Sequence, residues 1–165
     1  MGDLTQARLM ELLIYDPAAG DFCWRISRGN RIPAGLKTGC VNKVGYKVIR
    51  VDGRLYSAHR LAVLYMTGAM PAADVDHINN DRSDNRWSNL RRATSSQNCC
   101  NTYRMKNNTS GVKGVYRPAG RKNWTARLSF EGTTRHLGCF PTKEAAEAAV
   151  LSARAATHGE FMNPG

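Results

Sequence analysis

The alternation of apolar and polar residues is clearest in the second quarter of the chain. Residues 45–51 alternate, turn at Asp52-Gly53 and return over residues 54–57, which is the pattern of a β-hairpin with a tight turn. A helix follows in which the leucines recur at helical spacing, and Gly68 ends it. A hairpin followed by a helix is therefore predicted in this part of the chain.

Shorter elements are predicted before this hairpin. Thr5 is expected to cap a helix with leucines on one side, and residues 21–25 are expected to form a strand. Residues 27–43 contain four glycines or prolines and four basic residues, without an apolar period. This composition predicts an exposed basic loop.

The centre of the chain predicts a strand, a loop, a second strand and a helix in a short span. An apolar strand over residues 75–78 is followed by a loop rich in Asn and Asp over residues 79–88. Residues 89–93 are expected to form the second strand, and residues 95–103 a short helix.

The last third of the chain predicts a small sheet and a longer helix. Residues 104–110 are polar and basic and are expected to be a linker. Beyond them we predict strands over residues 114–116, 124–130 and 133–140, and a helix over residues 143–157. The helix positions expected to face the sheet are mostly small: Ala145, Ala146, Ala149, Val150 and Ala153.

These elements predict an α+β protein. It would consist of a small N-terminal α/β region, a central ββα unit, and a C-terminal three-stranded antiparallel sheet packed on one helix. The expected domains are residues 1–57, 58–103 and 111–165, with residues 104–110 as the linker.

The distribution of charge indicates a polyanionic partner. The 165 residues include 24 Lys and Arg against 13 Asp and Glu, a formal net charge of +11. Residues 1–73 hold ten basic and five acidic residues, residues 74–103 hold four of each, and residues 104–165 hold ten and four. A neutral centre between two basic flanks suits a polyanion held on both sides of a site where a metal ion supplies positive charge.

The sequence argues against membrane, secreted and zinc-stabilised proteins. No stretch approaches the roughly 18 apolar residues that a membrane-spanning helix needs, and residues 1–10 lack the apolar core of a signal peptide. The five cysteines include no Cys-x-x-Cys pair, so neither a disulfide framework nor a structural zinc is expected. We expect a cytoplasmic protein with reduced thiols.

The central residues fit the hydrolysis of a phosphodiester. This reaction needs an activated water, which a neutral imidazole can provide, and stabilisation of the phosphate and of the leaving oxygen, which a hard divalent cation can provide. Asp76 and His77 are neighbours in a predicted strand, so their side chains point to opposite faces. One of them can therefore bind the metal while the other faces the attacking water. Asn98 on the following helix offers a second oxygen ligand.

Several groups of central residues match a known motif. They are Asp76-His77-Ile78, Asn85, Asn89-Leu90-Arg91 and Gln97-Asn98, preceded by His59-Arg60-Leu61 and Gly68-x-x-Pro71. This set resembles the HNH endonuclease motif of a ββα-metal finger, as phage and homing enzymes carry it. The resemblance implies that His77 is the general base and that Asn89 holds the loop that orients it. Asp76 and Asn98 would hold one Mg²⁺ or Mn²⁺, and Asn98 in place of the name-giving His leaves an oxygen-only ligand set.

His59 is a second histidine that could act as the base. It precedes the central unit at the start of a helix. Packing at the helix start or a phosphate contact is the alternative interpretation, and we prefer it. His136 lies in a predicted strand, and His158 lies near a helix end, where a cationic imidazole suits the helix dipole.

A second pattern runs through the last third of the chain. Its residues are Gly111 to Tyr116, Trp124-x-Ala126-x-Leu128, Leu137-Gly138-x-Phe140 and Glu144-Ala145-Ala146. They resemble the Apetala/ethylene-responsive-factor DNA-binding domain, in which a three-stranded sheet enters the major groove. The resemblance implies DNA contacts by Lys113, Tyr116, Arg117, Trp124, Arg127 and Arg135.

This C-terminal pattern also departs from the family. Arg127 stands at an acidic position, Ser129 at a basic one and His136 at a Trp, so the base preference of the plant proteins does not carry over. Trp124 fits core packing equally well, and the basic side chains fit phosphate contacts that position without specifying a sequence.

The two resemblances imply a phage- or mobile-element-type endonuclease in a bacterial cytoplasm. It would cut or nick double-stranded DNA, as a monomer or a dimer, and leave 5′-phosphate and 3′-hydroxyl ends. Residues 1–57 would add a small basic sheet that contacts DNA. The alternative is a non-catalytic DNA-binding regulator on a degenerate HNH scaffold, against which the intact Asp76, His77, Asn89 and Asn98 argue. An RNA-directed nuclease is weaker, because no aromatic stacking platform is evident.

Overall fold

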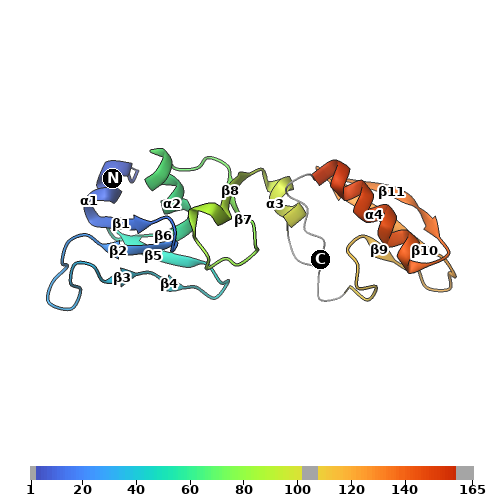
Figure 1. The fold of residues 1–165 in the computed structure, drawn as a ribbon, viewed down its shortest axis with the longest axis horizontal. Helices are drawn as coiled ribbons and strands as arrows, with labels where there is room; N and C mark the ends of the chain where they lie inside the picture. The colour runs from blue at the N-terminus through green and yellow to red at the C-terminus, as the bar shows by residue number, and fades with distance from the viewer. Residues whose placement is uncertain (1–2, 102–107, 159–165) are drawn as a thin grey trace. The chain divides into compact units, whose positions relative to one another are not determined.

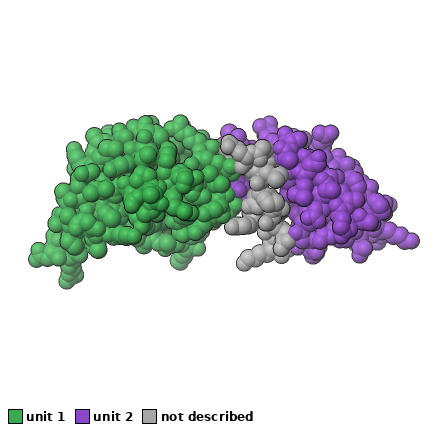
Figure 2. Space-filling model, in the orientation of Figure 1, with its two compact units in different colours: residues 1–93 green, residues 94–165 purple. Residues whose placement is uncertain are grey.

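The computed structural model describes residues 3–101 and 108–158, without the side chains of residues 99, 100 and 158 (Figure 1). The chain divides into two compact units, residues 1–93 and residues 94–165, which Figure 2 shows in different colours. Most of the predicted linker, residues 104–107, lies outside the described residues.

The first unit has two three-stranded sheets, ordered β1-β2-β3 and β4-β5-β6, and a two-stranded sheet of β7 and β8 (Figure 1). Its elements are α1 (Gln6–Leu12), β1 (Leu13–Asp16), β2 (Asp21–Trp24), β3 (Lys37–Thr38), β4 (Cys40–Val41), β5 (Lys47–Val51), β6 (Arg54–Ser57), α2 (Ala58–Thr67), β7 (Asp74–His77), the 3₁₀ helix η1 (Trp87–Asn89) and β8 (Leu90–Ala93).

Local sequence signals explain where many of these elements begin and end. The Thr5 hydroxyl accepts a hydrogen bond from the backbone N–H of Arg8 at 3.2 Å and caps α1. Asp52 and Gly53 both have positive φ, 44° and 82°, which a tight hairpin turn between β5 and β6 requires. Gly68 ends α2 in the left-handed conformation. The predicted hairpin and helix are thereby confirmed.

The prediction of an uninterrupted loop over residues 27–43 is wrong. Both β3 and β4 lie within it, β3 paired with β2 and β4 paired with β5. Each strand is two residues long, so no alternation is visible in the sequence. Their hydrogen bonds go to longer neighbouring strands, and this pairing defines them as strands.

One hydrophobic core joins the N-terminal strands to the central strands. Tyr15 stacks on Phe22 with ring centroids 4.7 Å apart, and Tyr65 of α2 meets both rings edge-on. Val75 of β7 and Leu90 of β8 belong to the same cluster of buried residues. The boundary that the sequence suggests between residues 57 and 58 therefore lies inside one packed unit.

The turn between β1 and β2 lies directly against the loop between β7 and η1. A Cβ atom on Gly20 would lie 2.4 Å from the backbone nitrogen of Arg86 and 2.5 Å from the carbonyl carbon of Asn85. The backbone N–H of Trp87 also donates to the carbonyl of Pro17 at 2.9 Å. Only glycine allows this approach at position 20.

The second unit is a three-stranded antiparallel sheet, ordered β11-β10-β9, with one helix packed on it. Ala146 and Val150 of that helix are fully buried in its core, as the predicted small-residue face requires. This arrangement and the mixed first unit confirm the predicted α+β class. The elements are α3 (Ser95–Asn101), β9 (Val115–Tyr116), β10 (Trp124–Phe130), β11 (Thr133–Phe140) and α4 (Lys143–His158).

None of the helices in the described ranges is both long enough and apolar enough to span a membrane.

Gly20→Ala is expected to destabilise the protein more than Gly53→Ala. Both glycines have positive φ, so both substitutions carry a backbone cost of about 1–2 kcal/mol. A methyl group at position 20 would also meet the backbone of residues 85 and 86, whereas no atom of the described residues lies within 4 Å of a Cβ at position 53. Because overpacking costs about 1–3 kcal/mol, urea titration should show this additional loss for Gly20→Ala. Equal losses for the two variants would contradict the close packing.

Candidate active site

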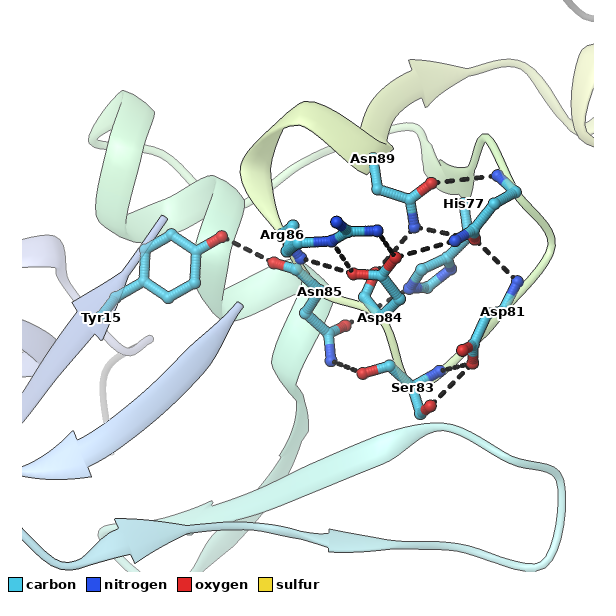
Figure 3. A network of polar contacts seen from close by, with 9 residues as sticks. Tyr15, His77, Asp81, Ser83, Asp84, Asn85, Arg86 and Asn89 are labelled. Atoms are coloured by element: carbon cyan, nitrogen blue, oxygen red, sulfur yellow. Dashed lines mark hydrogen bonds and ion pairs between the residues drawn. The ribbon is translucent and has the colours of Figure 1, made fainter. Parts of the chain in front are cut away.

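His77 ends β7 and faces a buried asparagine of the following loop (Figure 3). It is only 4% exposed, and its Nε2 lies 3.3 Å from Oδ1 of Asn85. The Asn85 amide nitrogen donates to the carbonyl of Ser83 at 2.9 Å, which directs the amide oxygen toward the ring. Since an amide oxygen only accepts, Nε2 carries the hydrogen and Nδ1 carries the basic lone pair.

The backbone of Asn85 is held by the N-terminal strands. The hydroxyl of Tyr15 in β1 donates to the carbonyl of Asn85 at 2.7 Å (Figure 3). Burial raises the pKa of Tyr15, so this hydroxyl stays a donor at neutral pH. Asn85 itself is 1% exposed. The side chain that faces His77 is thus fixed from the other side of the core.

Asn89 closes the loop that follows His77. Its Oδ1 accepts from the backbone N–H of Asn79 at 3.0 Å, and its Nδ2 donates to the Asn79 side chain at 2.9 Å and to the carbonyl of Asp84 at 2.8 Å. Figure 3 shows Asn89 above the loop. The three bonds join the two ends of the loop, and none of them goes to the His77 ring.

Two carboxylates of this loop are engaged by groups of the loop itself. Asp81 accepts from the backbone N–H and the hydroxyl of Ser83 at 2.9 and 2.7 Å. Arg86 pairs with Asp84 at 2.8 and 2.6 Å and lowers the pKa of that carboxyl to about 2. Both carboxylates are therefore ionised at neutral pH.

Burial determines the protonation state of His77. It lowers the pKa of the imidazole, while the bond to Asn85 and the carboxylates of Asp76, Asp81 and Asp84 act in the opposite direction. The net direction is downward, so the ring is neutral at neutral pH. A neutral imidazole is the form that accepts a proton from water.

His59 lies beside His77, a neighbourhood that the sequence does not reveal. Their ring centroids are 5.1 Å apart, and Tyr46 lies 5.1 Å from His59 and 6.0 Å from His77. His59 is 7% exposed, and burial lowers its pKa to about 4. Its Nδ1 has no hydrogen-bond partner among the described residues. The packing interpretation of His59 fits this burial, and its place next to His77 adds a polar ring to the site.

Asp76 lies opposite Arg91 in the β7–β8 pair. The Nε and Nη2 atoms of Arg91 lie 2.9 and 2.8 Å from Oδ2 of Asp76, and both side chains are largely buried. The motif contained Arg91 without a role for it. Its place opposite Asp76 indicates a role: Arg91 holds the Asp76 carboxylate in a fixed position.

The residues fit a cation that takes few protein ligands. Among the described residues, no group of three or more His, Cys, Asp or Glu is placed to hold a metal. Mg²⁺ commonly takes one or two carboxylates and keeps several waters. Asp76 carries a carboxylate, the ligand type that such a cation takes, and its role as a ligand stays a prediction. Asn98 lies in α3 of the second unit, and its role as a ligand stays a prediction.

The predicted DNA contacts of the second unit lie on and beside its sheet. The guanidinium of Arg127 in β10 lies 4.2 Å from the ring centroid of Tyr116 in β9, and that of Arg117 lies 5.4 Å from Trp124. Arg117, Arg127 and Arg135 are exposed, and Lys113 is half-buried. Trp124 is half-buried against the core, and the guanidinium of Arg117 lies over its ring. Core packing and a DNA contact therefore both remain compatible with its position.

Known proteins resemble this chain in the region of His77. Residues 56–99 match a family model described as HNH endonuclease. The chain is 32% identical over 125 residues to the uncharacterized HNH endonuclease L560 of Acanthamoeba polyphaga mimivirus, an alignment that covers 75% of this chain. It spans 64% of the length of that viral protein.

A solved structure also aligns with much of the chain. It is described as DNA binding and cleavage by the HNH homing endonuclease I-HmuI, and it covers 82% of this chain and 75% of its own, with a TM-score of 0.43 and 20% identity. The sequence match is the stronger finding, and it contains Asp76, His77, Asn85 and Asn89. Over residues 56–99 the chain therefore matches the HNH endonuclease family.

Proposed function

We propose that this chain is a metal-dependent endonuclease that hydrolyses double-stranded DNA with His77 as the general base. The observation that carries the proposal is the bond between His77 Nε2 and the fixed amide oxygen of Asn85. It leaves the lone pair of a buried, neutral imidazole on Nδ1. A base held in one tautomer by a fixed acceptor is what proton abstraction from water requires.

In the proposed reaction, Nδ1 of His77 takes a proton from a water that attacks phosphorus. The bond from phosphorus to the 3′ oxygen breaks, and that oxygen takes up a proton from solvent water, so the products are a 5′-phosphate and a 3′-hydroxyl. Asn85 and the ionised Asp81 and Asp84 stabilise the imidazolium that forms at His77. When bound by Asp76 and Asn98, Mg²⁺ or Mn²⁺ would stabilise negative charge on the phosphate and the leaving oxygen.

Asn89 and Arg91 serve as positioning residues in this proposal. Asn89 holds the loop that carries Asn85, through its bonds to Asn79 and Asp84. Arg91 holds the carboxylate of Asp76. Neither side chain needs to touch the reacting water.

The basic flanks would hold the DNA on both sides of this centre. Residues 104–165 have ten basic against four acidic residues, and the exposed arginines of the second unit lie on and beside its sheet. The proposed contacts are Lys113, Tyr116, Arg117, Trp124, Arg127 and Arg135. Residues 1–57 would add further phosphate contacts.

His77→Ala is expected to reduce DNA cleavage by about 10² to 10⁴, the usual contribution of a general base. Because the ring is buried and does not lie on the basic flanks, duplex affinity should stay within about twofold. Cleavage of a supercoiled plasmid with Mg²⁺ or Mn²⁺ and a gel-shift titration measure the two quantities. His136→Ala, at an exposed position of β11, is the matched control.

A His77→Ala variant that cuts as fast as the wild type would contradict the role of His77. A wild-type protein that binds duplex DNA tightly and cuts no plasmid with either metal would favour the regulator instead.

Replacing both Arg127 and Arg135 by Gln is expected to weaken duplex binding and to reduce its salt dependence. Each phosphate contact contributes about 0.9 to the slope of log affinity against log salt. The loss of two contacts should therefore reduce the slope by about two. Arg121→Gln, an exposed arginine of the same unit outside the predicted contacts, is the control. An unchanged slope in the double variant would show that the sheet does not hold DNA.

A further inference from the structure

Arg82 has a fixed position in the loop that follows His77. Its Nη1 donates to the carbonyl of Val44 at 3.0 Å, and its guanidinium lies 5.0 Å from the ring centroid of Tyr46. The side chain is nevertheless exposed. A cation that is both exposed and held in place is prepared to bind a ligand.

Tyr46 connects Arg82 to the candidate base. The Tyr46 ring lies 6.0 Å from the ring of His77 and 5.1 Å from the ring of His59. It comes from the turn that precedes β5, whereas Arg82 comes from the loop after β7. The guanidinium of Arg82 and the imidazole of His77 therefore contact the same tyrosine ring, although the two residues are five positions apart in the sequence.

The other two arginines that the structure pairs in this region are already neutralised. Arg86 is paired with Asp84 at 2.8 and 2.6 Å, and Arg91 with Asp76 at 2.9 and 2.8 Å. Within the described ranges, no carboxylate forms an ion pair with Arg82. The groups that hold Arg82 are a carbonyl and an aromatic face, neither of which carries a full negative charge.

We propose that Arg82 binds a backbone phosphate of the nucleic-acid strand that lies against His77, with Tyr46 as its platform. This inference rests on the proposed function and adds a substrate-binding residue to it. A planar guanidinium can donate two parallel hydrogen bonds to phosphate oxygens. One of its five N–H groups is used by Val44, so two parallel donors remain compatible with the observed contact.

The chain provides a matched pair of arginines for the test. Arg82→Gln removes an exposed cation that pairs with no carboxylate in the described part of the chain, and Arg86→Gln removes a cation of the same loop that is paired with Asp84. Duplex affinity is measured by gel shift in EDTA, so that the result does not depend on cleavage. Arg82→Gln is expected to weaken binding about tenfold and to reduce the salt slope by about one. Arg86→Gln should change affinity by less than about twofold.

Tyr46 provides a second, independent arm. Tyr46→Phe keeps the ring and should keep wild-type affinity, whereas Tyr46→Leu removes the platform and should weaken binding. In the double variant of Tyr46→Leu and Arg82→Gln, the loss should be smaller than the sum of the two single losses, because both act on one contact. Arg82→Lys keeps the charge without the planar fork, and it should keep the salt slope and lose part of the affinity.

Wild-type affinity and salt slope in Arg82→Gln would overturn the proposal, as would equal losses in Arg82→Gln and Arg86→Gln. The proposed nuclease function fails separately, if the wild-type protein does not cut DNA with any divalent metal. A protein that fails to cut but loses affinity and slope in Arg82→Gln would keep the phosphate contact and lose the catalytic assignment.

Discussion

The hydrogen bond between Asn85 and His77 is the interaction on which the candidate site depends. It exists because the Asn85 amide is fixed by Ser83 and the Asn85 backbone is fixed by Tyr15. The close approach of Gly20 to residues 85 and 86 holds the same loop in place. The N-terminal strands come from the least informative part of the sequence. They nevertheless fix the position of Asn85, and through Asn85 that of the candidate base His77. Residues 56–93 without these strands would lack part of their own core.

The neutral centre of the chain is built from specific ion pairs. Asp76 is paired with Arg91 and Asp84 with Arg86, so two of the four acidic and two of the four basic residues in this segment neutralise each other locally. Paired charges of this kind fix geometry and leave little net field for a polyanion. Attraction for a phosphate backbone then depends on the basic flanks, on a bound cation and on the exposed Arg82.

Elements with local signals were predictable from the sequence, and contacts between distant segments were not. Asp52-Gly53 and Gly68 determine a turn and a helix end by backbone conformation alone, and the strand order of the second unit follows from its turns. In contrast, β3 and β4 are defined by partners outside their own segment. The proximity of His59 to His77 depends on how α2 packs, and the contact of Gly20 with Asn85 depends on two loops far apart in the chain.

The most direct test of this account is ¹⁵N NMR of the His77 ring at neutral pH, with the signal assigned by its loss in His77→Gln. We predict a protonated Nε2 and an unprotonated Nδ1, and an average of the two tautomers in Asn85→Ala, because the fixed acceptor is then missing. A wild-type ring protonated on Nδ1, or one whose tautomer is unchanged in Asn85→Ala, would contradict the claim that Asn85 prepares His77 as a base.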